Sequence, residues 1–512
     1  MIDLIIVLIY FFIVFITAFS GRIKNISSEQ YFLNSRSLKW HSIAISTIAT
    51  NIQGYQFLGM MGSAYLFGIA QASLEINAIQ GLLIAAFVFV PLFLKEKIIT
   101  ISQFIKIKLG KTLAFTYSIT YLVFYSTITI GAALFWGAYA ADSVFNNELS
   151  FLSENRITRI AILIFFLGVF SALYTYFGGL SAVVKTDIIQ FCFLTIGGIA
   201  ILATTLYHIG GWSKLYELSP DKMHLYLPSD HEFLPWTHVL GLFFLNINYW
   251  CGNQIVMQRS IAAKNLGHAQ TGLMVGGLLK YLMALIIIIP GVALYNINPN
   301  LISEPDIAYP YIIKTFIPIG FKGIILCGLF ASLMSTVDST FNSIATLWSI
   351  DIYSVLINKK ATSKEKVDAG KASIIVSLFS GLIMGFVFLL MKFENPELAF
   401  THSLNELRYI IFSGLILLVC LTVLLINPKS KFILFCFILT ILTNIFIKIF
   451  FSDINYFLRT FMSVGAWIIV ILIINRKKLT LFNKLFKSYS IKHRNFGFLL
   501  LLSLILINYF FK

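Results

Sequence analysis

Long apolar runs recur along the whole of this 512-residue chain. Hydrophobic residues make up 58% of the sequence and charged residues 12%, whereas a soluble globular domain carries about 25% charged residues. Each run is about 17–25 residues long, which is enough for a helix to cross a bilayer. We therefore predict an all-α polytopic membrane protein without a sizeable soluble domain.

Apolar runs and turn signals predict about fourteen membrane-spanning helices. We place them at residues 2–19, 40–68, 72–94, 112–143, 157–176, 182–206, 235–257, 268–294, 321–354, 371–392, 403–426, 431–451, 456–475 and 495–511. The net charge of +16 resides mainly between these spans. It is therefore interpreted as a determinant of orientation and not as a nucleic-acid signal.

The charges between spans predict which side each turn occupies. If the N-terminus lies outside, the cytoplasmic turns include the basic pairs Arg36 and Lys39, Lys95 and Lys97, Arg259 and Lys264, and Lys359 and Lys360. The opposite turns are poorer in basic residues and carry acids such as Asp142 and Glu148. This alternation predicts that both termini lie outside an inner (cell) membrane.

Two classes of function are disfavoured by missing motifs. The sequence contains no GxxxxGK[ST] motif, which argues against ATP-driven transport by this chain. It contains no H-E-x-x-H or similar catalytic pair, so a membrane enzyme is the least favoured class.

The span at Ser46–Ala70 is interrupted by polar residues. Its middle reads Ala-Thr-Asn-Ile-Gln-Gly-Tyr-Gln where a plain span would carry Leu, Ile and Val. Polar groups at this depth are costly unless they face protein or water. The stretch predicts a discontinuous helix whose freed carbonyls suit Na+ and whose side chains suit a solute. A continuous packing or pore-facing helix remains the alternative.

A second polar interruption follows five spans later. It begins near Leu245 and reads Leu-Asn-Ile-Asn-Tyr-Trp-Cys-Gly-Asn-Gln. Two interrupted helices in corresponding positions of two five-helix halves indicate an inverted-repeat transporter.

The segment Ala331–Ser343 carries a row of polar residues on one helical face. They are spaced three and four apart and comprise Ser332, Ser335, Thr336, Ser339, Asn342 and Ser343. Hydroxyl oxygens in such a row can coordinate Na+ when another helix brings carbonyls opposite. Backbone hydrogen bonding or close helix packing is the competing explanation.

Three further positions carry charge or aromatic rings inside spans. Lys280 lies near the middle of its span and needs a partner, for which Glu75 is the obvious carboxylate. The pair either binds solute or holds helices together. Asp187 either attracts a cation along its exit path or caps the helix that follows the Gly178-Gly179 turn. Tyr249 with its neighbouring Trp either stacks on a sugar or packs.

Taken together, these stretches resemble the sodium/solute symporter family, and within it the sodium/sugar branch. The match runs from Tyr31 to Ile426 and includes Tyr-Phe-Leu at 31–33, Ala-Thr-Asn-Ile at 49–52, Gln-Phe-Leu-Gly-Met at 56–60, residues 178–187, Tyr-Trp at 249–250, Gln-Arg at 258–259, Ala331–Ser343 and Asp-Ile-Tyr at 351–353. Several motifs in the right order and spacing are more specific than any one alone.

The resemblance implies a leucine-transporter-type fold with a five-plus-five inverted repeat and alternating access. It implies that Na+ is co-transported and is not a catalytic cofactor. The implied sodium site lies between the first and eighth core helices. The implied sodium ligands are the carbonyls of Ala49, Ile52 and Ser332 and the hydroxyls of Ser335 and Thr336. Asp187 is implied on the ion exit path.

The resemblance also implies a sugar site. The corresponding residues are Asn51, Gln56, Glu75, Asn246, Lys280 and Asn405, with Tyr249 as an inner-gate aromatic and Met60 at the outer gate. The chain departs from the family pattern at Leu74, where an aromatic is expected, at Ala78, where a hydroxyl occurs in a related protein, and at Asn405, in a helix that aligns poorly.

The expected organisation is an extra helix at 1–20, a ten-helix core at 40–426 and three further helices at 427–512. The expected function is Na+-driven import of a small polar solute, foremost a monosaccharide such as galactose or glucose. The alternatives are another solute on the same fold (myo-inositol, an amino sugar or an organic acid, the last disfavoured by Glu75) and a non-transporting sensor or channel.

Overall fold

The computed structural model describes residues 2–20, 27–54, 56–231, 234–300, 307–395, 400–426, 428–476 and 489–512, with backbone only at 400–403. The stretch around Tyr55 is therefore described up to Gly54 and again from Gln56. Within these ranges the chain is almost entirely helical, and its two isolated β-bridges form no named strand.

The first half of the chain begins with the extra helix α1, which packs against α11 and α17, and continues with a broken helix and the long helices that follow it. Its elements are α1 (Ile2–Phe19), α2 (Ser28–Leu33), η1 (Asn34–Arg36), α3 (Trp40–Asn51), η2 (Gln56–Met60), α4 (Met61–Phe67), η3 (Gly68–Gln71), α5 (Ala72–Ile76), α6 (Ala78–Ile84), η4 (Ala85–Phe89), α7 (Val90–Lys95), α8 (Ile101–Leu109), α9 (Lys111–Phe124), η5 (Tyr125–Thr129), α10 (Ile130–Phe145), α11 (Arg156–Ile209), α12 (Trp212–Leu218) and η6 (Pro220–Lys222).

The second half repeats the pattern of a broken helix followed by long ones. Its elements are α13 (His238–Cys251), α14 (Gln254–Ile261), α15 (Leu266–Ile297), α16 (Ala308–Phe316), α17 (Phe321–Leu347), η8 (Trp348–Ile357), α18 (Ser363–Glu394), α19 (Phe400–Leu424), α20 (Ser430–Phe450), α21 (Tyr456–Ile474) and α22 (Ile491–Phe510).

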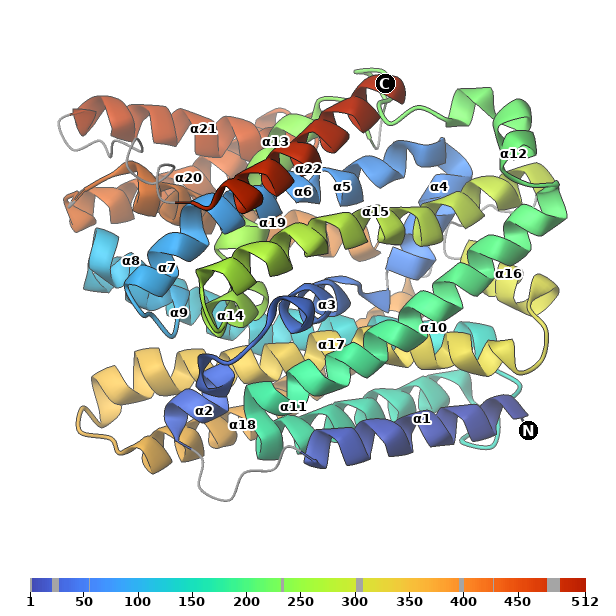
Figure 1. Ribbon diagram of the computed structural model, residues 1–512, viewed down its shortest axis with the longest axis horizontal. Coiled ribbons are helices and arrows are strands. Elements are labelled where there is room, and N and C mark those ends of the chain that lie inside the picture. Colours follow the sequence, from blue (N-terminus) through green and yellow to red (C-terminus); the bar gives the residue numbers. More distant parts are fainter. Residues whose placement is uncertain are drawn as a thin grey trace.

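Most of the helices run roughly along the longest axis of the molecule, which is horizontal in Figure 1. α1 lies at one edge beside α11, α20 to α22 lie at the opposite edge, and α17 passes through the interior (Figure 1). In the most apolar window of the run Phe321–Ile357, 94% of residues are buried, against 17% in α22. The hydroxyl-bearing segment of α17 is therefore surrounded by protein.

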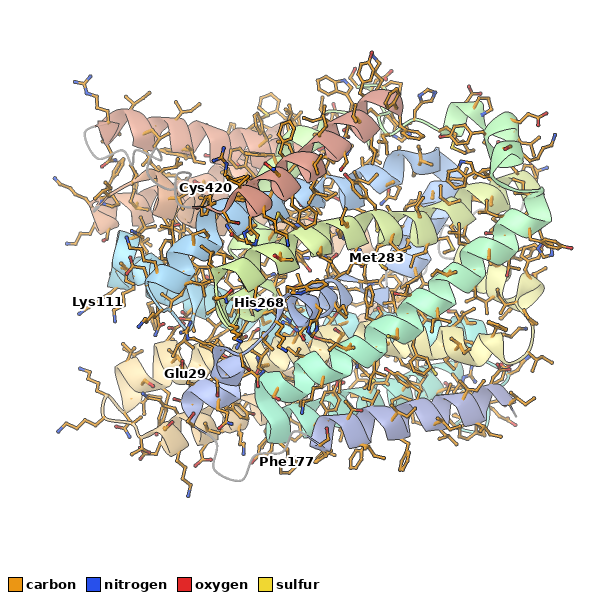
Figure 2. All side chains as sticks on the ribbon, in the orientation of Figure 1. Glu29, Lys111, Phe177, His268, Met283 and Cys420 are labelled. Atoms are coloured by element: carbon orange, nitrogen blue, oxygen red, sulfur yellow. The ribbon has the colours of Figure 1, made fainter. Side chains whose placement is uncertain are left out.

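Two labelled residues that fall in turns predicted to be cytoplasmic, those between residues 19 and 40 and between 94 and 112, lie at the same end of this bundle. Glu29 and Lys111 both lie toward the left in Figure 2, whereas the N and C labels lie in the right half of Figure 1. This arrangement agrees with an odd number of crossings between the N-terminus and those turns.

Eleven helical runs in the described ranges are long and apolar enough to cross a membrane, so the count of fourteen is not confirmed. The difference arises where helices bend or break. α11 is one run across two predicted spans, and the 12 residues of α3 and 14 of α13 are short because each ends at an interruption. The predicted division at residues 20, 40 and 427 stays a prediction.

The turn predicted at Gly178-Gly179 is a kink inside α11 and not a loop. Gly179 has φ +54° and ψ −149°, a region that residues with a Cβ avoid. An added Cβ there would lie 2.4 Å from the carbonyl oxygen of Tyr31. The kink turns the second half of α11 across α17 and places Asp187 inside the bundle.

The extra helix α1 is joined to α17 by the side chain of Asp3. Oδ1 of Asp3 accepts hydrogen bonds from the backbone N–H groups of Gly320, 2.9 Å away, and Gly323, 2.6 Å away. Gly320 is the N-cap residue of α17 and Gly323 lies in its first turn, where the N–H groups have no intrahelical acceptor. Asp3 therefore caps the helix that carries the hydroxyl stripe.

Candidate functional site

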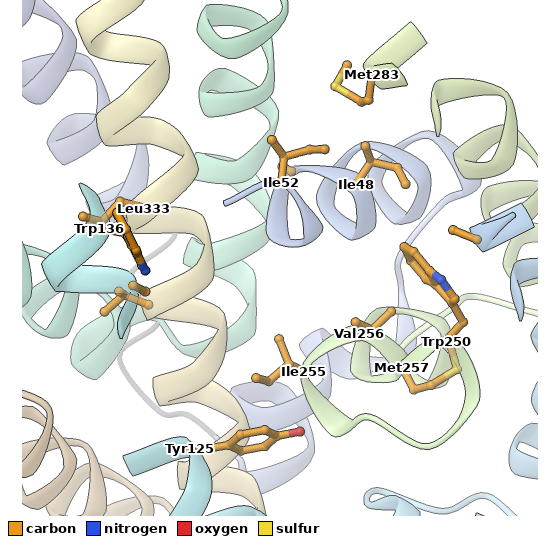
Figure 3. Packing of buried hydrophobic residues seen from close by; sticks show 14 of the residues in the cluster. Ile48, Ile52, Tyr125, Trp136, Trp250, Ile255, Val256, Met257, Met283 and Leu333 are labelled. Atoms are coloured by element: carbon orange, nitrogen blue, oxygen red, sulfur yellow. The ribbon is translucent and has the colours of Figure 1, made fainter. Parts of the chain in front are cut away.

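The predicted break in the first core helix is present. α3 ends at Asn51, Ile52 adopts extended angles (φ −78°, ψ 114°), and a wide π-type turn begins at Gln56. The continuous-helix alternative is therefore wrong for this span. Figure 3 shows Ile48 and Ile52 on α3, between Met283 on one side and the side chains of α14 on the other.

The break releases two carbonyls from the helical ladder. In a continuous helix the N–H of Gln53 would donate to Ala49, but here it donates to Oε1 of Gln56, 2.6 Å away. The N–H of Gln56 donates to the carbonyl of Gln53 at 2.9 Å and not to Ile52. The carbonyl oxygens of Ala49 and Ile52, both predicted sodium ligands, thus lose their usual donors.

The hydroxyl stripe of α17 lies against this broken end. Oγ1 of Thr336 donates to the carbonyl of Thr50 at 3.3 Å, and Oγ1 of Thr50 lies 3.3 Å from Oγ of Ser335. Oγ of Ser332 is buried and has no hydrogen-bond partner among the described residues. The structure therefore brings the broken end of α3, which carries the predicted carbonyl ligands, against the face of α17 that carries Ser335 and Thr336. These groups offer the hard oxygen donors that Na+ requires.

Asp187 lies at the centre of a buried polar cluster beside the stripe. Its carboxylate accepts hydrogen bonds from Ser46 and Ser335 and forms an ion pair with Arg259, whose Nη2 is 3.2 Å from Oδ2. Asp187 lies two turns beyond the kink at Gly179, so the prediction that it caps a helix is wrong. It links α11 to α3, α14 and α17.

Arg259 was interpreted from the sequence as a charge in a cytoplasmic turn, and this is wrong. Its side chain is fully buried in α14. Its Nε donates to Oγ of Ser46 at 2.8 Å, and its Nη2 donates to Oγ1 of Thr50 at 2.8 Å and to Ser339. A guanidinium can bridge several helices in this way because its donors point along fixed, divergent directions.

A second buried carboxylate escaped the sequence interpretation. Oδ2 of Asp338 accepts a hydrogen bond from the hydroxyl of Tyr174 at 2.6 Å, and Oδ1 accepts one from Ser339 at 3.2 Å. The signal was present, because Asp338 lies inside the hydroxyl stripe and a carboxylate in an apolar helix is costly unless paired.

Most of the predicted solute residues form one hydrogen-bonded cluster. Nζ of Lys280 contacts Glu75 and the amide oxygen of Asn51. Nε2 of Gln56 donates to Oε1 of Glu75 at 2.6 Å, and Nδ2 of Asn51 donates to the hydroxyl of Tyr249 at 3.0 Å. The expectation that Lys280 finds its partner in Glu75 agrees with this geometry. Five side chains from five elements, α3, η2, α5, α13 and α15, thus form hydrogen bonds or ion pairs with one another.

Two predicted solute residues lie outside that cluster. Asn246 donates to the backbone carbonyl of Asn77 at 2.9 Å and so links α13 to the start of α6. Asn405, on α19, lines a separate cavity of about 70 Å³.

This cavity adjoins the cluster through Tyr249. Its polar lining residues are Thr50, Gln53, Tyr125, Thr129, Tyr249, Asn253, Thr336, Asn405 and Arg408. Neither Gln53 nor Arg408 was singled out by the sequence. The cavity therefore lies between the predicted solute cluster, the hydroxyl stripe and α19.

The structure also describes the predicted outer-gate residue and two positions where the sequence departs from the family pattern. Met60 is buried in the π-type turn, Leu74 is partly buried in α5, and Ala78 is buried at the start of α6.

The second predicted interruption is present as well. α13 ends at Cys251 and α14 begins at Gln254. Oδ1 of Asn253 accepts from the N–H of Ile255 at 2.9 Å and from the hydroxyl of Tyr125 at 2.7 Å, which fixes the broken end against η5. In Figure 3, Trp250, Ile255 and Met257 surround this break.

The paired breaks agree with the comparison to known families. The family model "Sodium:solute symporter family" matches residues 31–425. The chain belongs to the sodium:solute symporter family. The sequence resemblance, which covered 31–426, is thereby confirmed.

The similar proteins include cotransporters of different solutes. A sodium/glucose cotransporter of Vibrio parahaemolyticus is 32% identical over 380 residues, covering 69% of this chain and 68% of that protein. A sodium/myo-inositol cotransporter of Mus musculus is 28% identical over 444 residues, and sodium/glucose cotransporter 1 of Ovis aries is 28% identical over 413. The chain spans 60% of the length of each of these mammalian relatives.

Solved structures of symporters share the fold. A substrate-bound, outward-open Na+-coupled sialic acid symporter matches with a TM-score of 0.79 and 19% identity, covering 94% of this chain and 99% of that one. A nucleobase-cation-symport-1 family transporter in a closed conformation matches with a TM-score of 0.57 and 14% identity, covering 92% and 99%. The predicted leucine-transporter-type fold is confirmed, and the chain is an integral membrane protein of a transporter family.

Proposed function

We propose that this protein is a Na+-driven symporter that imports a monosaccharide, with galactose and glucose as the first candidates, by alternating access. The observation that carries the proposal is the junction of α3 and α17, where two released carbonyls meet a buried hydroxyl stripe. Na+ is a transported substrate in this proposal. Membership of the sodium:solute symporter family and the hard oxygen donors at this junction both support transport driven by Na+.

In this proposal Na+ binds to the carbonyls of Ala49, Ile52 and Ser332 and to the hydroxyls of Ser335 and Thr336. Binding orders the broken helix in the outward-open form. The hydroxyl of Ser335 donates a hydrogen bond to Asp187, so a cation bound to the Ser335 oxygen changes the contacts of the Asp187 cluster, which links α11 to α3, α14 and α17. Release past Asp187 then opens the path inward.

The solute binds at the polar cluster of Asn51, Gln56, Glu75 and Lys280, with Asn246 and Asn405 as further contacts. Hydrogen bonds to the hydroxyl groups of the solute replace those that these side chains make to one another. Tyr249 is the inner-gate aromatic that closes the site. No covalent chemistry is required. Each Na+ that enters gains about 2.3 kcal/mol per 100 mV of membrane potential.

The proposal places the protein in the inner membrane with both termini outside. It retains the extra helix at 1–20, the transport core at 40–426 and the additional helices at 427–512. The charge distribution between the helices supports this orientation.

Uptake into proteoliposomes tests the proposal. Labelled galactose and glucose are supplied with an inward Na+ gradient, and with an inward K+ gradient as control, to the wild type and to the Ser335→Ala/Thr336→Ala double variant. We expect Na+-dependent accumulation that the double variant loses. Folded wild-type protein that accumulates neither hexose would refute the hexose assignment.

A related solute is the second candidate, because the similar proteins include myo-inositol cotransporters. Myo-inositol, amino sugars and organic acids are therefore supplied to the same vesicles. A sensor or channel would give ligand-induced shifts or ion currents without concentrative uptake.

A further inference from the structure

A second cavity lies in the basic stretch that joins α7 to α9. It has a volume of about 490 Å³ and is lined by Glu96, Lys97, Ile98, Gln103, Lys106, Ile107, Gly110 and Lys111. Lys111 lies at the left edge of the bundle in Figure 2. None of these residues belongs to the proposed solute or sodium site, so the cavity needs an explanation of its own.

The lining of this cavity is basic. Lys97, Lys106 and Lys111 are exposed, and their ammonium groups form no ion pair within residues 56–231 or the other described ranges. Glu96 is the one acid among the lining residues. Three ammonium groups thus face one carboxylate, which leaves the cavity with an excess of positive charge.

The neighbouring helix α20 adds to this charge. Ser430, at its first position, donates a hydrogen bond to the carbonyl of Leu109, at the end of α8. The residues on either side of Ser430 are the exposed Lys429 and Lys431. The positive charge therefore extends from the cavity to the adjoining turn.

Hydrogen bonds fix the backbone around the cavity. Nη2 of Arg36 donates to the carbonyls of Lys97 and Ile98, at 3.0 Å and 2.9 Å. Oε1 of Gln254, at the start of α14, accepts from the N–H of Ile101 at 2.9 Å. The wall that carries the lysines is therefore held against the second broken helix.

An exposed apolar strip leads away from the cavity along α9. Phe115, Ile119 and Val123 follow Lys111 at intervals of four residues and are 44%, 37% and 58% exposed. Side chains four residues apart lie on one side of a helix. Ile107, in the cavity wall, is exposed as well. An apolar surface of this kind on a membrane protein contacts acyl chains.

The charge and the apolar strip together favour an amphiphilic anion. Exposed lysines alone would attract any soluble anion, and an apolar strip alone would contact any lipid. An anionic phospholipid satisfies both, because its phosphate accepts charge-assisted hydrogen bonds from lysine and its acyl chains cover the strip. A lysine at the end of an apolar surface extends its ammonium group to the level of the headgroups.

We propose that the cavity between α7 and α9 is a binding site for the phosphate headgroup of an anionic phospholipid. Lys97, Lys106 and Lys111 bind the phosphate, and one acyl chain lies along Phe115 and Ile119. The site is independent of the transported solute and of Na+.

Lipid binding to the purified full-length protein in a neutral detergent tests this inference. Native mass spectrometry measures the affinity for short-chain phosphatidylglycerol and for phosphatidylcholine of the same chain length. Glycerophosphoglycerol, which is the headgroup without acyl chains, and inorganic phosphate are added as competitors.

The test variant is Lys97→Gln/Lys106→Gln/Lys111→Gln. The control is Lys359→Gln/Lys360→Gln/Lys364→Gln, which removes the same charge from exposed positions that do not line the cavity. Melting temperatures without added lipid report the folding of both variants.

We expect the wild type to bind phosphatidylglycerol at least about tenfold more tightly than phosphatidylcholine, because each lysine strengthens the attraction of an anionic headgroup about fivefold. The test variant should lose at least about tenfold of this affinity, and the control variant should bind as the wild type does. Neither soluble competitor should displace the lipid at equal concentration.

Three outcomes would overturn the inference. Equal wild-type affinity for the two lipids would exclude recognition of negative charge, and equal losses in both variants would indicate a general effect of surface charge. Displacement of the lipid by inorganic phosphate or glycerophosphoglycerol at equal concentration would identify a soluble anion as the ligand. The wild-type data decide the question even if the test variant fails to fold, and none of these results depends on sugar uptake.

Discussion

Arg259 and Asp187 form a fully buried ion pair between α14 and α11, with Nη2 and Oδ2 3.2 Å apart. Ser46 hydrogen-bonds to both partners. A pair of this kind costs desolvation when it forms, but the removal of one partner leaves an uncompensated buried charge. We infer that the pair fixes α14 against α11.

Loss of one partner of this pair should destabilise the protein. Arg259→Met is expected to cost about 3–5 kcal/mol and lower the apparent melting temperature in detergent. The double variant Arg259→Met/Asp187→Asn should recover part of the loss, because no net charge stays buried.

An exposed pair provides the control for this experiment. Lys214 and Glu217 lie 3.1 Å apart with exposed fractions of 45% and 68%, and Lys214→Gln should change stability by less than about 1 kcal/mol. Equal melting temperatures for Arg259→Met and the wild type would contradict the role of the buried pair.

Ligation of Na+ by a backbone carbonyl of α17 can be distinguished from ligation by a side-chain hydroxyl. Ser332 is proposed to use its carbonyl, and its hydroxyl has no partner among the described residues. Ser332→Ala should therefore leave the Na+ concentration for half-maximal uptake within about twofold, while Thr336→Ala should raise it at least tenfold. Equal shifts for both variants would show that the side chain of Ser332 is also a ligand.

The Lys280–Glu75 pair can be tested as a solute contact or as a structural link. Lys280→Met alone should lower both stability and uptake, because Glu75 is left buried without its cation. The double variant Lys280→Met/Glu75→Gln should recover the melting temperature but not the uptake. Recovery of both would mean that the pair is structural and does not bind solute.

Close packing around the second broken helix predicts one sensitive glycine. A Cβ on Gly81 would lie 2.5 Å from Cδ1 of Trp250 and 2.7 Å from the carbonyl oxygen of Asn246. Gly81→Ala should therefore displace α13 from α6 and reduce the initial rate of uptake.

A second glycine serves as the matched control. A Cβ on Gly276, in α15, would meet only the side chain of Ile48, at 3.7 Å. Gly276→Ala should retain normal uptake and stability. A similar loss in both variants would indicate a general effect of alanine in these helices and refute the packing argument.

The broken helices were predictable because they carry polar residues inside otherwise apolar runs. Asn51 and Gln56 within an apolar run, and Lys280 at mid-span, each demand a polar partner. The partner of Lys280 was therefore found from sequence, and the interruption near Gly252 followed from the same argument.

The inner cluster was not predictable, because its geometry depends on the kink at Gly179. The position of Arg259, at the end of an apolar run, is compatible with a loop, and nothing local reveals that α11 bends Asp187 toward it. The orientation of α19 likewise depends on Arg459, more than 50 residues away, which binds Glu406 and leaves Asn405 and Arg408 facing the cavity.

The cap that Asp3 places on α17 has a consequence for biosynthesis. The carboxylate and its first N–H partner are separated by 317 residues, which at roughly 5–20 residues per second corresponds to about 15–65 seconds of translation. α1 therefore waits in the bilayer until most of the chain has been inserted. The helix that carries the proposed sodium ligands is thus capped by a residue that is translated 317 positions before its partner.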